Sequence, residues 1–203
     1  MIDIKILNTI KGFMDDDEAI RLFELADKAS CMGAVLEIGS YCGRSAAIIG
    51  TACQKNNGIL YSIDHHVGSE EQQPGEEYFD PELFDERTGG VNTLPLFRET
   101  LKKTNLEDTV IPIVSKSVVV GKMWQTKLSM VFIDGGHSFE AAHTDFLTWS
   151  PHLLTNGLLV IHDIFLDPDL GGQAPRQVYE RAIATGMYTE LAMTKTLGVL
   201  KLN

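Results

Sequence analysis

Residues 35–45, VLEIGSYCGRS, join an apolar run that ends in an acid to a turn bracketed by two glycines and to the start of a helical pattern. Gly39 and Gly43 lack a Cβ atom, so the backbone between them can turn tightly and approach a ligand closely. The helix predicted over residues 45–54 aims its free N–H groups and the positive end of its dipole at the same place. This order of strand, glycine turn and helix predicts one unit of an α/β fold, with a ligand at the turn.

Apolar runs and helical patterns alternate along the rest of the chain. The strands are predicted over residues 34–38, 59–63, 110–114, 130–133, 158–161 and 198–201. The helices are predicted over residues 15–30, 45–54, 93–103, 139–149 and 177–184. Strands that alternate with helices favour a mainly parallel central sheet with helices on both faces. With 203 residues and neither a linker nor an internal repeat, the chain is predicted to form a single α/β domain over residues 1–203.

Polar residues close five of the predicted strands. They are Glu37, Asp64, Ser117, Asp134, His162 and Asp163. Open α/β sheets bind their ligands at the carboxyl ends of the strands. One acid after a strand is usually a helix cap, but polar residues after five strands favour a common binding site.

Composition and charge argue against several classes of protein. The net charge is −11, whereas a nucleic-acid surface needs clustered lysine and arginine, so we expect no nucleic-acid partner. No stretch approaches the ~20 apolar residues that span a bilayer, and residues 1–12 lack the features of a signal peptide. Cys31, Cys42 and Cys53 show neither disulfide nor zinc-ligand spacing, which favours a reducing, cytoplasmic location. The sequence leaves open whether the chain forms a homo-oligomer.

The negative charge is concentrated in residues 66–90, which hold eight acids and one base, Arg87. Tyr78, Phe79 and Phe84 lie among these acids. The length and position of an insertion over residues 66–92 suggest a lid over the substrate, and its acids would select a cationic acceptor. A solvated surface loop held by its three aromatic residues is the alternative.

Three kinds of ligand suit such a turn to different degrees. A dinucleotide site requires G-x-G-x-x-G, and Tyr41 stands where the second glycine would be. A phosphate-binding P-loop requires Gly-Lys-Ser/Thr, whereas this chain has Gly43, Arg44 and Ser45. S-adenosylmethionine fits best, because its ammonium group suits Glu37 and its carboxylate suits the helix N-terminus. The alternative is that these residues form an ordinary strand-to-helix turn that binds no ligand.

Residues 36–45 (LEIGSYCGRS) resemble the cofactor-binding stretch of catechol-type O-methyltransferases, which are class I S-adenosylmethionine-dependent methyltransferases. Residues 132–140 (FIDGGHSFE) and 161–163 (IHD) are similar to a bacterial group that O-methylates sugars of macrolide antibiotics. The resemblance implies a Rossmann-like methyltransferase fold and a set of residues that hold S-adenosylmethionine. The set is Glu37, Gly39, Tyr41 and Ser45 at the methionine part, Asp64 at the ribose, His65 and Ser117 at the adenine, together with Ser40, Gly43 and Asp134.

The same resemblance implies the groups that face the acceptor. His137 lies three residues after Asp134, the offset at which catechol-type enzymes carry a lysine, and it is our predicted general base. A structural histidine is the alternative. Asp134, His162 and Asp163 are predicted metal ligands, where the family has Asp, Asp and Asn for magnesium. Because imidazole suits softer ions than magnesium, manganese or iron is conceivable, as is a site without a metal.

These features predict an S-adenosylmethionine-dependent methyltransferase that methylates a hydroxyl group of a small-molecule acceptor, with Asp134 and His137 facing that acceptor. Two alternatives remain. One is a non-catalytic S-adenosylmethionine-binding protein on the same fold. The other is an NAD(P)-linked oxidoreductase, against which the missing second glycine counts. The sequence does not identify the acceptor.

Overall fold

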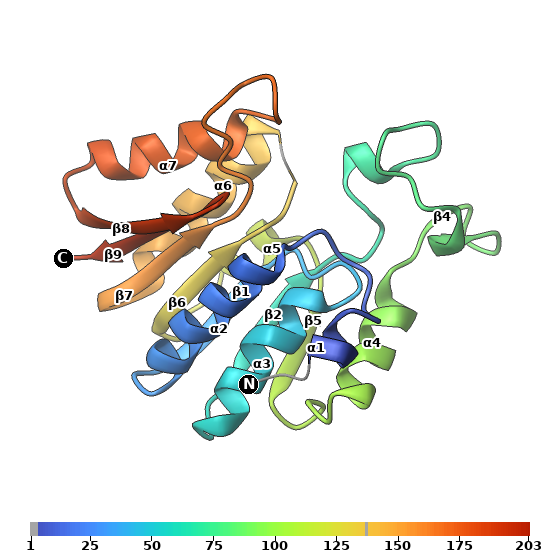
Figure 1. Ribbon diagram of the computed structural model, residues 1–203, viewed down its shortest axis with the longest axis horizontal. Coiled ribbons are helices and arrows are strands. Elements are labelled where there is room, and N and C mark those ends of the chain that lie inside the picture. Colours follow the sequence, from blue (N-terminus) through green and yellow to red (C-terminus); the bar gives the residue numbers. More distant parts are fainter. Residues whose placement is uncertain (1–3, 137) are drawn as a thin grey trace.

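A seven-stranded sheet forms the centre of the computed structural model, which describes residues 4–136 and 138–203. The strands lie in the order β5-β2-β1-β6-β7-β9-β8 (Figure 1). Their bounds are β1 (Ala34–Ile38), β2 (Leu60–Asp64), β5 (Val110–Val114), β6 (Leu128–Ile133), β7 (Leu153–Ile161), β8 (Tyr188–Thr194) and β9 (Leu197–Leu202). The first five pair in parallel, whereas β9 is antiparallel to both β7 and β8. The predicted, mainly parallel sheet is therefore confirmed.

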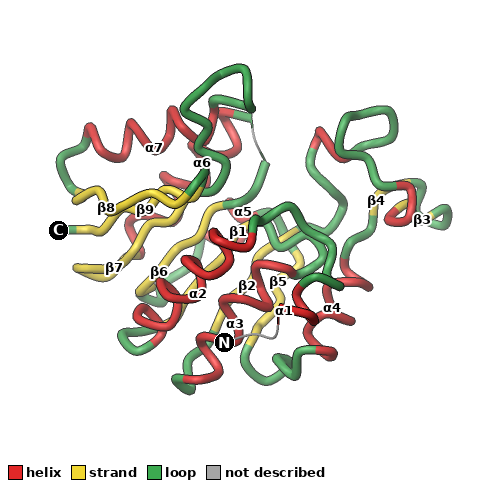
Figure 2. Tube along the Cα trace, in the orientation of Figure 1, coloured by secondary structure: helices red, strands yellow, loops and turns green. Residues whose placement is uncertain are grey.

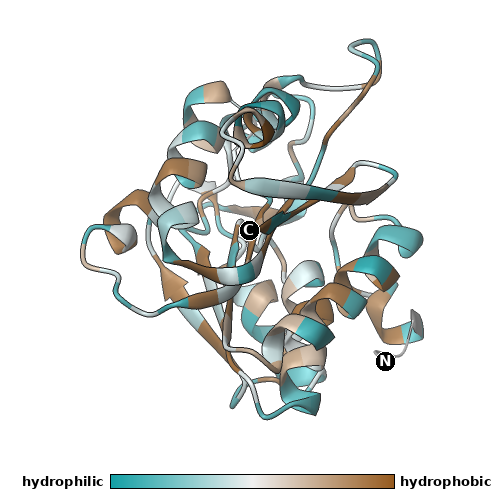
Figure 3. Ribbon diagram, turned by 90° about the vertical axis from the view of Figure 1, so that its left-hand side faces the viewer, coloured by the Kyte–Doolittle hydropathy of each residue, from teal (hydrophilic) through white to brown (hydrophobic). Residues whose placement is uncertain are grey.

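Helices cover both faces of this sheet (Figure 1). One face carries α2 (Asp16–Ser30), α3 (Arg44–Lys55) and α4 (Leu94–Lys103), and the other carries α5 (Ser117–Gly121), α6 (Phe139–Trp149) and α7 (Ala174–Ala184). Successive residues of a strand point to opposite faces. Val35 therefore packs in the core beneath α2 and α3, and Leu36 packs in the core beneath α6 and α7. Burial on both faces explains the continuous apolar runs of the sequence, which colour the central strands brown in Figure 3.

The predicted insertion, residues 66–92, lies between β2 and α4 and projects away from the sheet (Figure 2). It consists of two short 3-10 helices and a two-stranded hairpin, η1 (Glu70–Gln72), η2 (Pro81–Leu83), β3 (Phe84–Asp85) and β4 (Gly90–Val91). Lys11 connects it to the segment that follows the short helix α1 (Ile4–Leu7). The Lys11 Nζ atom lies 2.5 Å from Asp80 Oδ2 and 2.6 Å from Glu82 Oε2. The insertion is therefore anchored to the N-terminal segment.

Several predicted boundaries are wrong at the carboxyl-terminal side of the chain. β7 begins at Leu153, after the 3-10 helix η3 (Ser150–His152), and not at residue 158. α7 begins at Ala174 because Pro175, which lacks an N–H group, suits the first turn of a helix. The sequence does not predict β8, since only Tyr188 of this edge strand is buried and no apolar run marks it. Among residues 4–136 and 138–203, no helix has the length and apolar character that a bilayer crossing requires.

Candidate active site

The glycine turn, residues 39–43, connects β1 to α3 through a backbone with several positive φ angles. These are +84° at Gly39, +47° at Tyr41 and +93° at Gly43. A Cβ atom at position 39 would lie 2.0 Å from the backbone oxygen of Asp134, so only glycine fits here. The Asp134 N–H group in turn donates to the Ile38 carbonyl at 2.9 Å. The turn therefore meets the end of β6 by direct backbone contact.

Asp64, the last residue of β2, holds the glycine turn from the neighbouring strand. Its Oδ2 atom accepts hydrogen bonds from the backbone N–H groups of Ser40 and Tyr41, each at 2.9 Å. Its Oδ1 atom accepts one from the N–H group of His66 at 2.7 Å. Glu37 and Asp64 thus lie near the ends of two adjacent parallel strands, in the arrangement that the sequence predicts.

Glu37 is completely buried and only partly hydrogen-bonded. Its Oε1 atom accepts a hydrogen bond from Ser62 Oγ at 2.6 Å, whereas its Oε2 atom has no partner among the described residues. The Ser40 hydroxyl also lacks one within the described part of the chain. Burial raises the pKa of Glu37 to about 8, although the hydroxyls of Ser62 and Ser45 oppose this shift. A buried polar atom without a partner is costly, so these two atoms fit a ligand that hydrogen-bonds at the turn.

Ser117, the predicted adenine contact, is the first residue of α5, and its hydroxyl donates a hydrogen bond to Asp145 of α6. Burial raises the pKa of Asp145 to about 6, against the effect of this hydrogen bond. A Cβ atom at Gly135 would lie 3.2 Å from Asp145 Oδ2, so the acid borders the loop after β6. The sequence analysis does not assign Asp145. Its position on the buried face of α6, between Ala142 and Phe146, is the signal that identifies it.

Asp134, His162 and Asp163 lie together at the ends of β6 and β7, as the sequence predicts. The His162 Nδ1 atom is 3.1 Å from Asp134 Oδ1 and 3.4 Å from Asp163 Oδ1. The three ligand atoms all lie within 4.8 Å of one another. Two ligands on opposite sides of an ion with bonds of ~2.1 Å are about 4.2 Å apart, and the distances from His162 Nδ1 to the two carboxylates stay below this limit. A small hollow lined by Gly135 and Gly136 borders it.

A further acid, Glu18 in the first turn of α2, reaches this group and is not assigned by the sequence analysis. Its Oε2 atom is 3.1 Å from His162 Nε2, and its Oε1 atom accepts hydrogen bonds from the N–H and hydroxyl groups of Thr196 at 2.8 and 2.7 Å. Burial disfavours the charge of Glu18, but the hydrogen bonds from His162 and Thr196 outweigh it and lower the pKa of Glu18 to about 2. Burial also disfavours an imidazolium, but the surrounding carboxylates, Asp134 first, raise the pKa of His162 well above its usual range.

The remaining histidines of interest have different surroundings. His137 lies outside the described residues, so its role as general base stays a prediction. His65 is partly exposed, and its Nδ1 atom accepts a hydrogen bond from the Val67 N–H group at 3.2 Å. His66 is buried, and its Nδ1 atom lies 2.7 Å from Thr93 Oγ1. Burial lowers the pKa of His66, and the contact with Thr93 anchors the start of the insertion.

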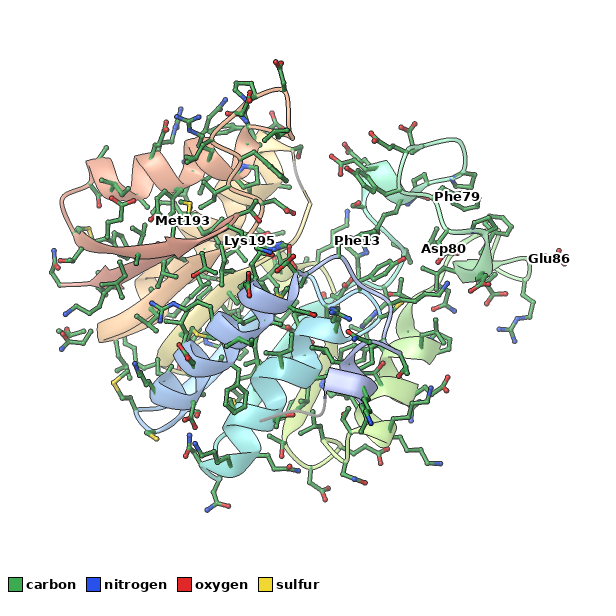
Figure 4. All side chains as sticks on the ribbon, in the orientation of Figure 1. Phe13, Phe79, Asp80, Glu86, Met193 and Lys195 are labelled. Carbon is green, nitrogen blue, oxygen red and sulfur yellow. The ribbon has the colours of Figure 1, made fainter. Side chains whose placement is uncertain are left out.

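Exposed apolar side chains surround the approach to this edge of the sheet. Phe13, 66% exposed, has its ring centre 5.7 Å from that of Tyr41 and 5.8 Å from that of Tyr78 in the insertion. Figure 4 shows Phe13 on the side of the sheet that faces the insertion. Leu166 and Leu170 in the loop after β7 are also exposed. These residues offer an apolar border to a molecule that approaches the strand ends.

Residues 36–164 match the model of a family described as a methyltransferase domain, and the chain belongs to this family. The matched range begins in β1 and ends directly after Asp163, so it contains both the glycine turn and the Asp134, His162 and Asp163 group. The prediction of a class I S-adenosylmethionine-dependent methyltransferase is thereby confirmed, and the oxidoreductase alternative loses its support.

Solved structures share the fold at low sequence identity. The O-methyltransferase TomG from Streptomyces achromogenes, in complex with SAM, is 17% identical, with 94% of this chain and 81% of that chain covered and a TM-score of 0.64. The O-methyltransferase from Bacillus cereus, in complex with SAH, is 13% identical, with coverage of 98% and 87% and a TM-score of 0.64. The SAH-bound methyltransferase PaMTH1 from Podospora anserina is 13% identical, with coverage of 98% and 93% and a TM-score of 0.60. These similarities confirm the Rossmann-like methyltransferase fold.

Proposed function

We propose that this methyltransferase transfers the methyl group of S-adenosylmethionine to a hydroxyl group of a small molecule. The observation that carries the proposal is the Oε2 atom of Glu37, which is buried at the glycine turn without a partner among the described residues. An ammonium group supplies the donor that this oxygen lacks, and the N-terminus of α3 suits the carboxylate of the same ligand. TomG and the Bacillus cereus protein are O-methyltransferases, which supports a hydroxyl acceptor.

The other predicted cofactor residues lie along the same edge of the sheet. Asp64 already accepts hydrogen bonds from Ser40, Tyr41 and His66. An ionised carboxylate has about four acceptor positions, so Asp64 can still accept a hydrogen bond from a ribose hydroxyl. The Ser117 and Asp145 pair would meet the adenine, whose exocyclic amine is a hydrogen-bond donor. Contacts from Gly43, Ser45 and His65 are part of the same proposal.

The chemical step requires alignment and the removal of one proton. S-adenosylmethionine supplies an activated methyl group on a positively charged sulfur. The acceptor oxygen forms a bond to the methyl carbon while the carbon–sulfur bond breaks and leaves its electron pair on sulfur. In our proposal His137 takes the proton of the acceptor hydroxyl, because an imidazole titrates near neutrality. Asp134 orients the acceptor, and such alignment is worth ~7–11 kcal/mol in favourable cases.

The group of Asp134, His162 and Asp163 would hold a divalent cation, which its spacing fits. When bound, such an ion lowers the pKa of the acceptor hydroxyl. A set of one imidazole and two carboxylates suits manganese or iron better than it suits magnesium. If no metal binds, the Asp134 carboxylate accepts a hydrogen bond from the acceptor hydroxyl directly.

The insertion would act as the lid of the acceptor site. The charge of Glu77, with smaller contributions from Glu71 and Asp163, raises the pKa of Tyr78. The Tyr78 phenol is therefore close enough to Asp163 for the two to interact electrostatically. Aromatic rings beside these carboxylates favour an acceptor with an apolar or cationic part. Phe13 would complete the wall on the N-terminal side.

Turnover of methyl-labelled S-adenosylmethionine tests this function. The protein is incubated with phenolic, catecholic and sugar hydroxyl acceptors, in EDTA and in Mn²⁺, and labelled product is counted. We expect product with at least one class of hydroxyl acceptor. Calorimetric binding of S-adenosylmethionine and SAH without turnover of any acceptor would overturn the catalytic proposal in favour of a binding protein. Binding of NAD(P) in their place would overturn the cofactor assignment as well.

A further inference from the structure

Glu18 makes more contacts than the start of a helix requires. The Oε2 atom of Glu18 accepts a hydrogen bond from the Asp15 N–H group at 3.2 Å, which completes the capping box of α2. The same atom faces His162 Nε2 at 3.1 Å, and the Oε1 atom binds Thr196. The side chain is 3% exposed, so these contacts are made away from solvent. A helix cap alone would not need a buried imidazole or a residue from the β8–β9 turn.

The contact with Glu18 requires that Nε2 of His162 carries hydrogen. An ionised carboxylate only accepts hydrogen bonds, so Nε2 has to be a donor toward Glu18. The other ring nitrogen, Nδ1, then faces Asp134 and Asp163 at 3.1 and 3.4 Å. The same rule makes Nδ1 a donor to these two carboxylates, so an ion would have to displace the Nδ1 hydrogen, while Nε2 keeps its own hydrogen toward Glu18. Histidines that bind metals usually donate their other N–H group to a carboxylate in this way.

We propose that Glu18 is a positioning residue for a transition-metal site, and that it holds His162 so that Nδ1 joins Asp134 and Asp163 as a ligand for Mn²⁺ or Fe²⁺. This inference rests on the proposed function and deepens it, because it concerns the acceptor side of the same site. The imidazole makes the site prefer Mn²⁺ to Mg²⁺. Glu18 itself does not touch the ion.

The substitution Glu18→Gln tests the hydrogen-bond direction with little change in shape. The new amide oxygen can still accept from Thr196, but the amide nitrogen that then faces His162 is a donor. Nε2 would have to accept, so the ring would keep its one hydrogen on Nδ1 and present no lone pair to the metal. Thr196→Val is the matched control, because it removes a hydrogen bond to Oε1 and leaves the contact between Oε2 and His162 in place.

Mn²⁺ affinity is measured by electron paramagnetic resonance of the free ion and by calorimetry, without S-adenosylmethionine. We expect one Mn²⁺ per wild-type chain, bound at least 10-fold more tightly than Mg²⁺. Loss of an outer carboxylate typically weakens metal binding by about 10–100-fold, and we expect this for Glu18→Gln. Thr196→Val should stay within about 2-fold, since its contact with His162 is unchanged. Equal Mn²⁺ affinity in wild type and Glu18→Gln would overturn the inference.

The wild-type protein provides a test that does not depend on the folding of a variant. Nitrogen-15 spectra of the histidines with diamagnetic Zn²⁺ should show His162 protonated at Nε2 and coordinated at Nδ1, and the opposite arrangement would contradict the proposal. Calorimetry with S-adenosylmethionine distinguishes a failure of the proposed role of Glu18 from a failure of the proposed function. A protein that binds this cofactor but no Mn²⁺ disproves the role of Glu18 and leaves the proposed function standing. A protein that binds Mn²⁺ but no S-adenosylmethionine disproves the proposed function instead.

Discussion

Glu37 and Glu18 are two buried glutamates in different regions of the molecule, and their pKa values shift in opposite directions. Both are nearly or fully excluded from solvent, at 0% and 3% exposure. The pKa of Glu37 is raised to about 8 by burial, whereas the pKa of Glu18 is lowered to about 2 because hydrogen bonds from His162 and Thr196 outweigh burial. The difference lies in their partners. Glu18 has donors for both oxygens, and Glu37 has a donor for only one among the described residues.

This comparison separates the proposed site into a cofactor side and an acceptor side, which are built differently. The cofactor side is shaped by backbone, through the positive φ angles of the glycine turn and the N–H groups held by Asp64. It leaves a buried carboxyl oxygen for a ligand to satisfy. The acceptor side is shaped by side chains, and Glu18 and His162 already satisfy one another. An unpaired buried acid therefore indicates ligand binding more directly than a paired one does.

The largest effect is expected where the two sides touch. Gly39→Ala would place a Cβ atom 2.0 Å from the Asp134 carbonyl oxygen, in a backbone with φ of +84°. Overpacking and a left-handed backbone together cost about 3 kcal/mol or more, so the free energy of unfolding should fall by that amount in chemical denaturation. Gly172→Ala is the control, since a Cβ atom there meets nothing within 4 Å. Equal stability of the two variants would show that the two sides do not depend on this contact.

Glu37→Gln should separate stability from binding on the cofactor side. Removal of the charge partner of an ammonium group should weaken S-adenosylmethionine binding by about 100-fold in calorimetry. Because the folded pKa of about 8 exceeds the ordinary value of 4.5, the carboxyl group favours folding below pH 4.5 and loses that contribution as the pH rises toward 8. A glutamine does not ionise, so the variant should be more stable than wild type at pH 7, by on the order of 2 kcal/mol. If the variant binds the cofactor as tightly as wild type does, the unpaired oxygen of Glu37 does not indicate ligand binding, and the contrast with Glu18 fails.

The smallest effect is expected at the insertion. Lys11→Met removes the ion pairs with Asp80 and Glu82, and pairs that are partly or fully exposed contribute about 1 kcal/mol or less. The insertion should open more often, so tryptic cleavage after Arg87 should become about 2–5-fold faster while the melting temperature changes little. Lys103→Met removes a pair with Glu99 on α4 and serves as the control. If both variants are cleaved at the wild-type rate, Lys11 does not hold the insertion.

The strand, turn and helix of the proposed cofactor side can be predicted from the sequence because they are local. Residues 35–45 show the strand, the turn and the helix in one stretch, and Asp64 follows from the next strand. A parallel sheet brings strand ends to one edge, so Asp134, His162 and Asp163 can be placed together without a structure. The structure confirms this grouping.

The remaining contacts could not be predicted because they join distant parts of the chain. Glu18 lies 144 positions before His162 and 178 before Thr196. In sequence, Glu18 is one of four successive acids at a helix start, and the capping box with Asp15 explains it fully at that level. Thr196 belongs to the turn after β8, an edge strand whose exposed side chains leave no apolar pattern.

The hydrogen bonds between Glu18 and Thr196 can form only late in the synthesis of the chain. The glycine turn, Ser62 and Asp64 leave the ribosome early, and their mutual contacts need nothing beyond the first strands. Thr196 is translated 178 positions after Glu18, and β9 has to insert between β7 and β8 to place it. The contacts that hold Glu18 beside His162 and Thr196 can therefore be completed only near the end of translation, after the glycine turn and the first strands have been made.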